Sequence, residues 1–401
     1  MLGSGSRRPR VLFSFPHTLG DPGIGTTAAH QVQELIAQDY DVYVYCTCSR
    51  VDLQRAARVV QTLVVSGHRV PHRALGIERA YNYHDQRVAL ALPRLRGSID
   101  LIHAWPGSCL RSFAAAVKLG IPSFREVPNP HTRSALEDSE IAAKHVGVTL
   151  PVSDPHRFSE LKVVKDNSEF NAANFLLAPS KFVEESFTAR GFSRDKVLSH
   201  RYGFDPVSFP ARSAADQHDE PAPFTAAFVG RGEPRKGLHF ALEAWLDSGI
   251  AGYGRFLVVG KVMHEYRRAL EPGISHPSVS ELGFVSDVGK VLRTADVLVF
   301  PTVSEGSALV TYEAMASGCV PLVSDAAGSY VHHLRDGLVH HAGDVRSLTK
   351  HLRMTAADGA LLNRLSQGAL SRRSELSWEG AAHALGDAYG IGIARHRGKP
   401  S

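Results

Sequence analysis

The stretch from Ala295 to Cys319, ADVLVFPTVSEGSALVTYEAMASGC, constrains the fold more than any other part of this chain. Its apolar run Val297 to Phe300 is followed by a proline, which is typical of a strand buried on both faces in a parallel sheet. We expect a helix to follow almost at once, capped by Ser304 or Ser307 and ended by Gly318. The sequence therefore predicts a strand, a short polar loop and a helix.

Two carboxylates, Glu305 and Glu313, stand on this loop and this helix. A helix N-terminus presents unpaired N–H groups and a positive dipole end, so phosphate is a natural ligand there. A carboxylate repels phosphate but accepts hydrogen bonds from hydroxyls, so one on each side suits the sugar rings at both ends of a diphosphate. This arrangement favours a nucleotide sugar. In the alternative, Glu313 is a solvated helix residue and Glu305 only interacts favourably with the helix dipole.

The segment PTVSEGSALVTYEAMASGCVPLVSDAAGSYVHHLRDG, residues 301–337, resembles the donor-site signature of glycosyltransferase family 4, the retaining enzymes of the GT-B fold. With its Glu-x7-Glu spacing, the resemblance implies that Glu313 holds the ribose hydroxyls and that Glu305 contacts the transferred sugar. The family's aromatic-glycine pair after Glu-Gly is Ser-Ala here, so the sugar stays open. The other donor contacts implied on this loop are Gly306, Ser307, Leu309 and Val310.

Length and composition indicate the number of domains and the class of protein that carries this site. A chain of 401 residues suggests two domains, and 43% apolar with 21% charged residues is typical of a soluble globular protein. The net charge of +5 allows a diphosphate, an acidic acceptor or a lipid surface, but is too dispersed to indicate nucleic acid. No signal peptide or apolar run near 18 residues is found, so we expect a cytoplasmic protein with reduced cysteines.

The chain opens with a strand at residues 10–15, a glycine-containing loop, a helix at 28–38 and a second strand at 41–46. Glycines at the carboxyl end of a first strand let the backbone approach a ligand. The spacing is not Gly-x-Gly-x-x-Gly, and no acidic residue ends the second strand, which argues against a dehydrogenase. The resemblance implies instead that Gly23 or Gly25 meets the donor diphosphate across the cleft.

Residues 50–96 are unusually rich in arginine, with nine arginines, no lysine and only three acidic residues. Apolar residues over 51–65 recur at near-helical spacing, which predicts a helix there. This helix is either a solvated element over the first domain or an edge that meets an anionic acceptor or a membrane surface.

Two further strands, at 99–105 and 120–128, carry histidines at or beyond their ends. We expect His103 to be structural. The resemblance implies that His131, in the loop PNPHTRSA, reaches the transferred sugar. An exposed loop histidine is the alternative.

A polar run at 211–223 separates two hydrophobic patterns. We predict an acceptor-side domain over 1–207, a donor domain over 208–376, and a helix near 377–401 that packs back on the first domain. In the second domain Arg231 and Lys236 flank a turn at a strand's carboxyl end, so both cations can meet one anion. The resemblance makes this turn the diphosphate clamp and Val285 a backbone contact of the base.

Alternating strands and helices predict an α/β fold of two doubly wound Rossmann-like domains facing a cleft, and the resemblance implies that this is the GT-B fold. We expect a retaining hexosyltransferase that moves a sugar from a nucleotide diphosphate sugar to a hydroxyl acceptor. The paired histidines are adjacent rather than at ligand spacing, so we expect no metal and no cofactor. A nucleotide-sugar epimerase, a sugar phosphorylase and a non-catalytic nucleotide-sugar binding protein are the alternatives.

Overall fold

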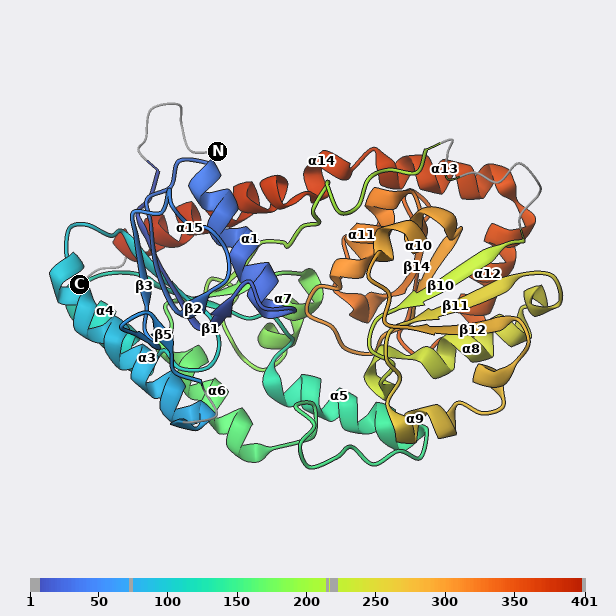
Figure 1. Cartoon of the computed structure of the whole chain (residues 1–401), viewed down its shortest axis with the longest axis horizontal. Coiled ribbons are helices and arrows are strands. Elements are labelled where there is room, and N and C mark those ends of the chain that lie inside the picture. Colours follow the sequence, from blue (N-terminus) through green and yellow to red (C-terminus); the bar gives the residue numbers. More distant parts are fainter. Residues whose placement is uncertain (1–7, 72–74, 214–215, 217–222, 399–401) are drawn as a thin grey trace.

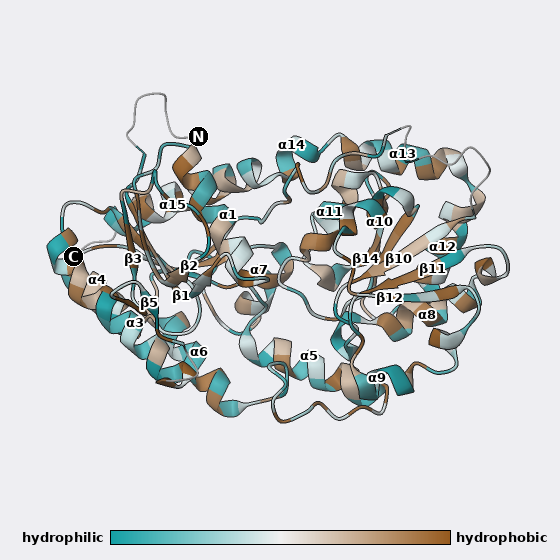
Figure 2. Cartoon of the chain, viewed as in Figure 1, coloured by the Kyte–Doolittle hydropathy of each residue, from teal (hydrophilic) through white to brown (hydrophobic). Residues whose placement is uncertain are grey.

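The computed structural model describes residues 8–71, 75–213, 216 and 223–398. These residues form two α/β units that lie side by side, each with a parallel sheet between layers of helices (Figure 1). The strands are mainly apolar and the outer helices carry most of the polar residues (Figure 2). Two doubly wound sheets in one chain are what the alternation of strands and helices predicts.

The first sheet has seven strands in the order β3-β2-β1-β6-β7-β8-β9, and each neighbouring pair is parallel. The strands predicted at 10–15 and 41–46 are confirmed as β1 and β2. The seven strands are β1 Val11–Leu19, β2 Val42–Ser49, β3 Arg58–Gln61, β6 Leu101–Ala104, β7 Ser123–Glu126, β8 Phe175–Ala178 and β9 Val197–Ser199.

Helices cover both faces of the first sheet. Apolar residues of α1 and α15 pack on one face, and those of α3, α4, α6 and α7 pack on the other. Helix α5 extends from this unit toward the second (Figure 1). The helices are α1 Ile24–Ala37, α3 Ile77–Ala91, α4 Leu110–Leu119, α5 Thr132–His145, α6 Glu160–Ala172, α7 Lys181–Thr188 and α15 Trp378–Arg397.

The second sheet has six parallel strands in the order β12-β11-β10-β13-β14-β15. They are β10 Thr225–Val229, β11 Arg255–Val259, β12 Val279–Gly283, β13 Val297–Phe300, β14 Val320–Ser324 and β15 Leu338–His340. Its helices are α8 Leu238–Asp247, α9 His264–Ala269, α10 Val288–Thr294, α11 Leu309–Ser317, α12 Val345–Ala357, α13 Gly359–Leu370 and α14 Arg373–Leu376.

The predicted strand and helix at the centre of the second unit are confirmed, with one correction. Strand β13 is buried along its whole length, and α11 ends at Gly318 in the left-handed conformation with φ 80°. A serine cap on α11 is wrong, because its N-cap is Ala308. The hydroxyl of Ser307 bonds the Tyr312 hydroxyl at 2.7 Å instead of a backbone N–H group.

The helix predicted over 51–65 is wrong. Its residues form the edge strand β3, paired with β2, and the first strand of a hairpin between β4 Val64–Val65 and β5 His68–Arg69. The apolar spacing fitted a helix, but four valines and a threonine crowd residues 59–65, and β-branched side chains favour a pleated strand.

Two chain crossings join the units. One runs from β9 to β10 and includes the predicted domain boundary at 207/208; the other returns at Ser377, which bridges to Phe204, and continues as α15. Helix α15 packs on the first unit, where the Tyr389 hydroxyl lies 2.7 Å from Nδ1 of the buried His103. Among the described residues no helix has the length and apolar character needed to cross a bilayer.

Candidate active site

A cavity of about 580 Å3 opens where both units face each other. The carboxyl ends of parallel strands lie at this edge, which is where open α/β sheets bind ligands. The first unit contributes most of the lining and the second contributes the loop around Arg235 and Ser304. Its mainly apolar wall includes Ile24, Tyr81 and Pro128.

At the edge of this cavity the carboxylate of Glu305 forms ion pairs with two cations. Its Oε1 lies 2.8 Å from the Arg235 guanidinium and 2.5 Å from Nζ of Lys236. Burial alone would raise the pKa of Glu305, but the two cations outweigh burial and lower the pKa to about 2. Glu305 is therefore a fixed negative charge, and it holds the two cations in place.

The turn that carries these cations is a short 3-10 helix, Pro234–Lys236, ended by Gly237 at φ 73°. Arg235 is buried and also donates to Glu233 at 2.7 Å. The side chain of Arg231 is about half exposed, at 49%, and makes only longer contacts, 3.4 Å to Asp154 and 3.5 Å to Glu233. Sequence reasoning missed Arg235, because a turn with two arginines gives no sign of which one points inward.

The environment of Glu313, on α11, is the opposite of the environment of Glu305. It is half-buried and makes no ion pair with any described residue. Burial raises its pKa to about 7. The carboxylate of Glu313 has acceptor sites that are not used, and burial makes its charge costly. Hydrogen bonds donated by the hydroxyls of a ligand would stabilise the charged form.

Gly306 brings the second unit into contact with the first. A Cβ at this position would lie 1.7 Å from the carbonyl oxygen of Pro128. The Ser180 hydroxyl, at the N-terminus of α7, donates to the Gly306 carbonyl at 2.5 Å. Three positions further along, Leu309 packs against the core of the first unit, whereas Val310 packs against that of the second.

The remaining predicted donor contacts lie at the start of α1 and in the loop after β12. Gly23 is the N-cap of α1 with φ 86°, and a Cβ at Gly25 would lie 2.7 Å from the Thr18 carbonyl. Ile24, between these glycines, lines the interdomain cavity. Val285 follows β12 and is half-buried against the second core.

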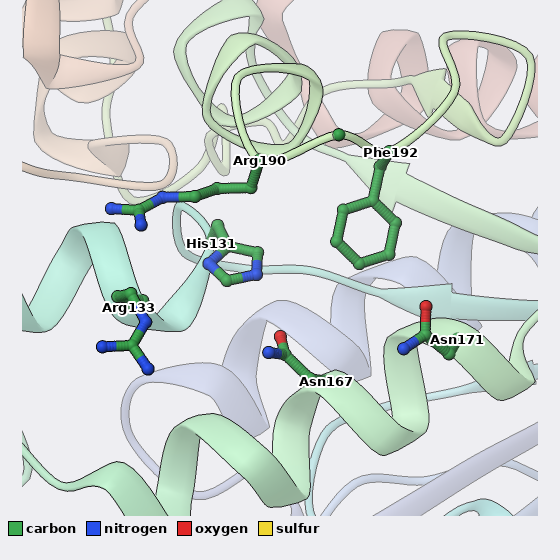
Figure 3. Close-up of a pocket in the computed structure, with 7 residues that line it drawn as sticks. His131, Arg133, Asn167, Asn171, Arg190 and Phe192 are labelled. Atoms are coloured by element: carbon green, nitrogen blue, oxygen red, sulfur yellow. The ribbon is translucent and has the colours of Figure 1, made fainter.

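The structure does not bring His131 together with Glu305 and Lys236. His131 is 3% exposed and lines a different pocket, whereas its neighbours Pro130 and Thr132 line the interdomain cavity. As the N-cap of α5, His131 directs its ring among phenylalanines of α6, α7 and the loop that follows, the last of which is Phe192 (labelled in Figure 3). Its predicted contact with the sugar is therefore not visible in this arrangement.

Within the described ranges no cluster of three or more histidine, cysteine, aspartate or glutamate side chains is arranged to hold a metal ion. The turn beside the cavity carries Arg231, Arg235 and Lys236, and Arg235 lines the cavity together with Arg125, Lys162 and Lys165 of the first unit. Such cations can stabilise a diphosphate by charge-assisted hydrogen bonds.

One comparison with known proteins matches the segment that carries this turn. Residues 223–358 match the family model described as Glycosyl transferases group 1. That segment contains the cationic turn, Glu305 and Glu313. The match covers the second unit and not the first.

Curated relatives match over part of their length. A D-inositol 3-phosphate glycosyltransferase of Streptomyces bingchenggensis is 32% identical over 111 residues, 26% of this chain and 24% of the relative. The protein of that name from Mycobacterium tuberculosis is 30% identical over 190 residues, 42% of this chain and 38% of the relative. The matched part thus spans about a quarter to two fifths of these relatives.

Solved structures match over nearly the whole chain. Sucrose-phosphate synthase from Thermosynechococcus elongatus has a TM-score of 0.68 at 19% identity and covers 97% of this chain and 100% of its own. Anabaena HepE, solved with UDP and glucose, has a TM-score of 0.64 at 17% identity and covers 95% and 99%. This chain has the GT-B fold of glycosyltransferases, as predicted.

Proposed function

We propose that this protein is a retaining glycosyltransferase of family 4 that transfers a hexose from a nucleotide diphosphate sugar to a hydroxyl acceptor. The observation that carries the proposal is the pair of carboxylates on one loop and helix. Glu305 is held between Arg235 and Lys236, while Glu313 is left without a cation. The group 1 family match over this segment and a structural neighbour solved with UDP and glucose support a nucleotide-sugar donor.

The charges around the turn suit a departing diphosphate. Three cations, Arg231, Arg235 and Lys236, are paired with the carboxylates of Asp154, Glu233 and Glu305, which hold them in place beside the cavity. When the sugar–phosphate bond breaks, negative charge grows on the leaving phosphate. Preorganised cations and the N-terminus of α11 stabilise that charge without a metal ion, and so lower the barrier.

Retention follows if the leaving phosphate accepts the acceptor's proton on the face from which it departs. Glu305 then orients the sugar, and Glu313 accepts hydrogen bonds from the ribose. Gly306 and Ser307 lie where the donor loop meets the first unit. Gly23 and Gly25 of the first unit meet the donor diphosphate from the opposite side of the cleft.

The test is an assay with UDP, GDP, ADP and TDP sugars, first by thermal shift and then by product analysis. A donor at 100 times its dissociation constant should stabilise the fold by about 2.7 kcal/mol. Proton NMR of the first-formed product should show an α-linkage from an α-donor. A β-linked product would demand a general base and would remove the protein from the retaining enzymes.

Three rival functions have distinct outcomes in the same assay. Turnover of the donor without an organic acceptor indicates an epimerase, and turnover that requires inorganic phosphate indicates a phosphorylase. Binding without any turnover indicates a nucleotide-sugar binding protein. Addition of EDTA should leave transfer unchanged, and loss of activity restored by Mg²⁺ or Mn²⁺ would contradict metal independence.

We further propose that the arginine-rich segment meets an anionic acceptor or membrane surface. Arg58, Arg87 and Arg94 line a hollow of about 290 Å3, with no acidic side chain among the described residues that line it. Leu90 beside them is 59% exposed. Changing the three arginines to glutamine should raise the acceptor KM and flatten its salt dependence, and leave donor affinity unchanged.

A cytoplasmic location belongs to the same proposal. All four cysteines are free and three of them are buried, which suits a reducing compartment. Fractionation of the native host would test this directly.

A further inference from the structure

A second pocket lies on the first unit, between α5, α6 and the loop after α7 (Figure 3). Its volume is about 320 Å3. None of the described residues that line it carries a carboxylate. They offer two guanidinium groups, two amides, an imidazole, a phenyl ring and a glycine: Arg133, Arg190, Asn167, Asn171, His131, Phe192 and Gly191.

The imidazole of His131 is the most buried part of this pocket. Its Nδ1 is covered by protein and has no hydrogen-bond partner, and Oδ1 of Asn167 is in the same state. The two side chains face one another (Figure 3), and the interaction with Asn167 partly offsets the lowering of the His131 pKa by burial. Buried polar atoms outside hydrogen-bonding geometry cost free energy, so ligand hydroxyls that bond to these atoms are favoured.

The two arginines approach from separate elements. Arg133 is in the first turn of α5 and pairs with Glu160 at 2.5 Å, and Arg190, after α7, pairs with Glu137 at 2.5 Å. A guanidinium has five N–H donors, so each arginine keeps donors for a ligand. Their side chains are about one third exposed, at 31% and 34%. Two such groups recognise a planar or tetrahedral anion well.

We propose that this pocket binds a small anionic sugar, with its phosphate, sulfate or carboxylate between Arg133 and Arg190. Its ring hydroxyls meet the imidazole of His131 and the amides of Asn167 and Asn171. A hydroxyl both donates and accepts, and therefore matches amides and a neutral imidazole. The pocket shares no lining residue with the cationic turn at Lys236, so it is separate from the donor site.

Isothermal titration calorimetry with glucose 6-phosphate, glucose and inorganic phosphate tests this proposal on the full chain. Glucose 6-phosphate should bind at least about tenfold more tightly than either fragment, because only it engages both the arginines and the amides. The double variant Arg133→Gln, Arg190→Gln should weaken binding about tenfold or more. Asn167→Asp should weaken it as well, because it places a carboxylate beside the anion.

Matched controls separate this pocket from the rest of the molecule. Arg364→Gln removes one exposed positive charge from α13, and Lys236→Ala alters the donor turn; neither should change glucose 6-phosphate binding. Thermal unfolding of each variant without ligand shows whether it is folded.

Three results would overturn the proposal. The wild-type chain could fail to bind glucose 6-phosphate, or Lys236→Ala could abolish binding that folded pocket variants retain. Phosphate alone binding as tightly as glucose 6-phosphate would refute recognition of the sugar.

Discussion

At the residue scale, two glutamates of one segment have opposite electrostatics. Glu305 has a pKa of about 2 because two cations outweigh its burial, whereas burial without a cation raises the pKa of Glu313 to about 7. The first is a permanent charge that positions Arg235 and Lys236. The second can change its protonation near neutral pH, which gives donor binding a predictable pH dependence.

Donor binding should weaken as pH falls below the pKa of Glu313. The carboxylate accepts hydrogen bonds from ribose hydroxyls and the protonated acid accepts them less well, so donor KM should rise between pH 8 and pH 6. Glu313→Gln should raise donor KM about tenfold at pH 8, from the loss of charge-assisted hydrogen bonds, and leave kcat largely intact. Steady-state kinetics across this range is the measurement. A variant that keeps the wild-type pH profile would show that another group titrates.

The different environments of Lys236 and Arg231 at the turn predict that removing each side chain lowers kcat by a different factor. Lys236→Ala should lower kcat by about 10²-fold, the scale of losing one group that stabilises the transition state. Arg231→Ala should cost less, because that side chain is half exposed and its contacts are longer than 3.3 Å. Single-turnover kinetics compares the two variants. Equal losses would mean that Arg231 swings inward when the donor binds.

At the element scale, the loop at Gly306 is the point where the second unit meets the first. The Ser180 hydroxyl and the Pro128 carbonyl both approach its backbone, and the approach to Pro128 leaves no space for a side chain. The contact is set by three elements: β13, which ends before the loop, α11, which follows it, and α7.

Gly306→Ala should therefore separate the two units at the donor loop. A Cβ placed 1.7 Å from a backbone oxygen cannot be accommodated by a side-chain movement. A displacement of about 1 Å at a reacting centre can cost about 10²-fold in rate, so we expect a fall of that order in kcat/KM. Gly359→Ala, at a position with open space around its Cβ, is the matched control. Unchanged kinetics in Gly306→Ala would show that this contact is absent during turnover.

Sequence pattern predicted elements best where burial decides the structure. Strand β13 and the end of α11 at Gly318 followed from an apolar run and one glycine. The edge strand β3 was mistaken for a helix because spacing was weighted above its β-branched residues. The choice between Arg231 and Arg235, and the direction of the His131 ring, depend on contacts between segments far apart in the chain, which no local pattern records.

At the scale of the whole molecule, one buried carboxylate connects the parts of the chain that join the units. Glu126, at the end of β7, accepts hydrogen bonds from Tyr202 at 2.9 Å and lies 2.8 Å from His200 and 3.1 Å from His103. His103 in turn meets Tyr389 of α15 at 2.7 Å. The carbonyl of His200 accepts a bond from Tyr330 of the second unit. The first sheet, the first crossing and the returning helix thus share one polar network.

The pKa of Glu126 gives this network a pH dependence. Burial would raise the pKa, but His200 and His103 outweigh burial and hold it well below the usual value. A carboxyl whose folded pKa is depressed stabilises the fold above its unfolded pKa, and this stabilisation is lost as pH falls toward the folded pKa. The connection between the units should therefore weaken in acid, below about pH 4.3.

Glu126→Gln should lower the free energy of unfolding at pH 7 by about 3 kcal/mol, the scale of breaking a buried pair by removing the charge of one partner. It should also reduce the loss of stability on acidification, because the titrating group is gone. Urea unfolding at pH 7 and pH 3 measures both effects. Glu265→Gln, an exposed carboxyl on α9, should change neither. If Glu126→Gln kept wild-type stability at pH 7, the network would satisfy its hydrogen bonds without a charge, and the charge of Glu126 would not be needed to hold the two crossings.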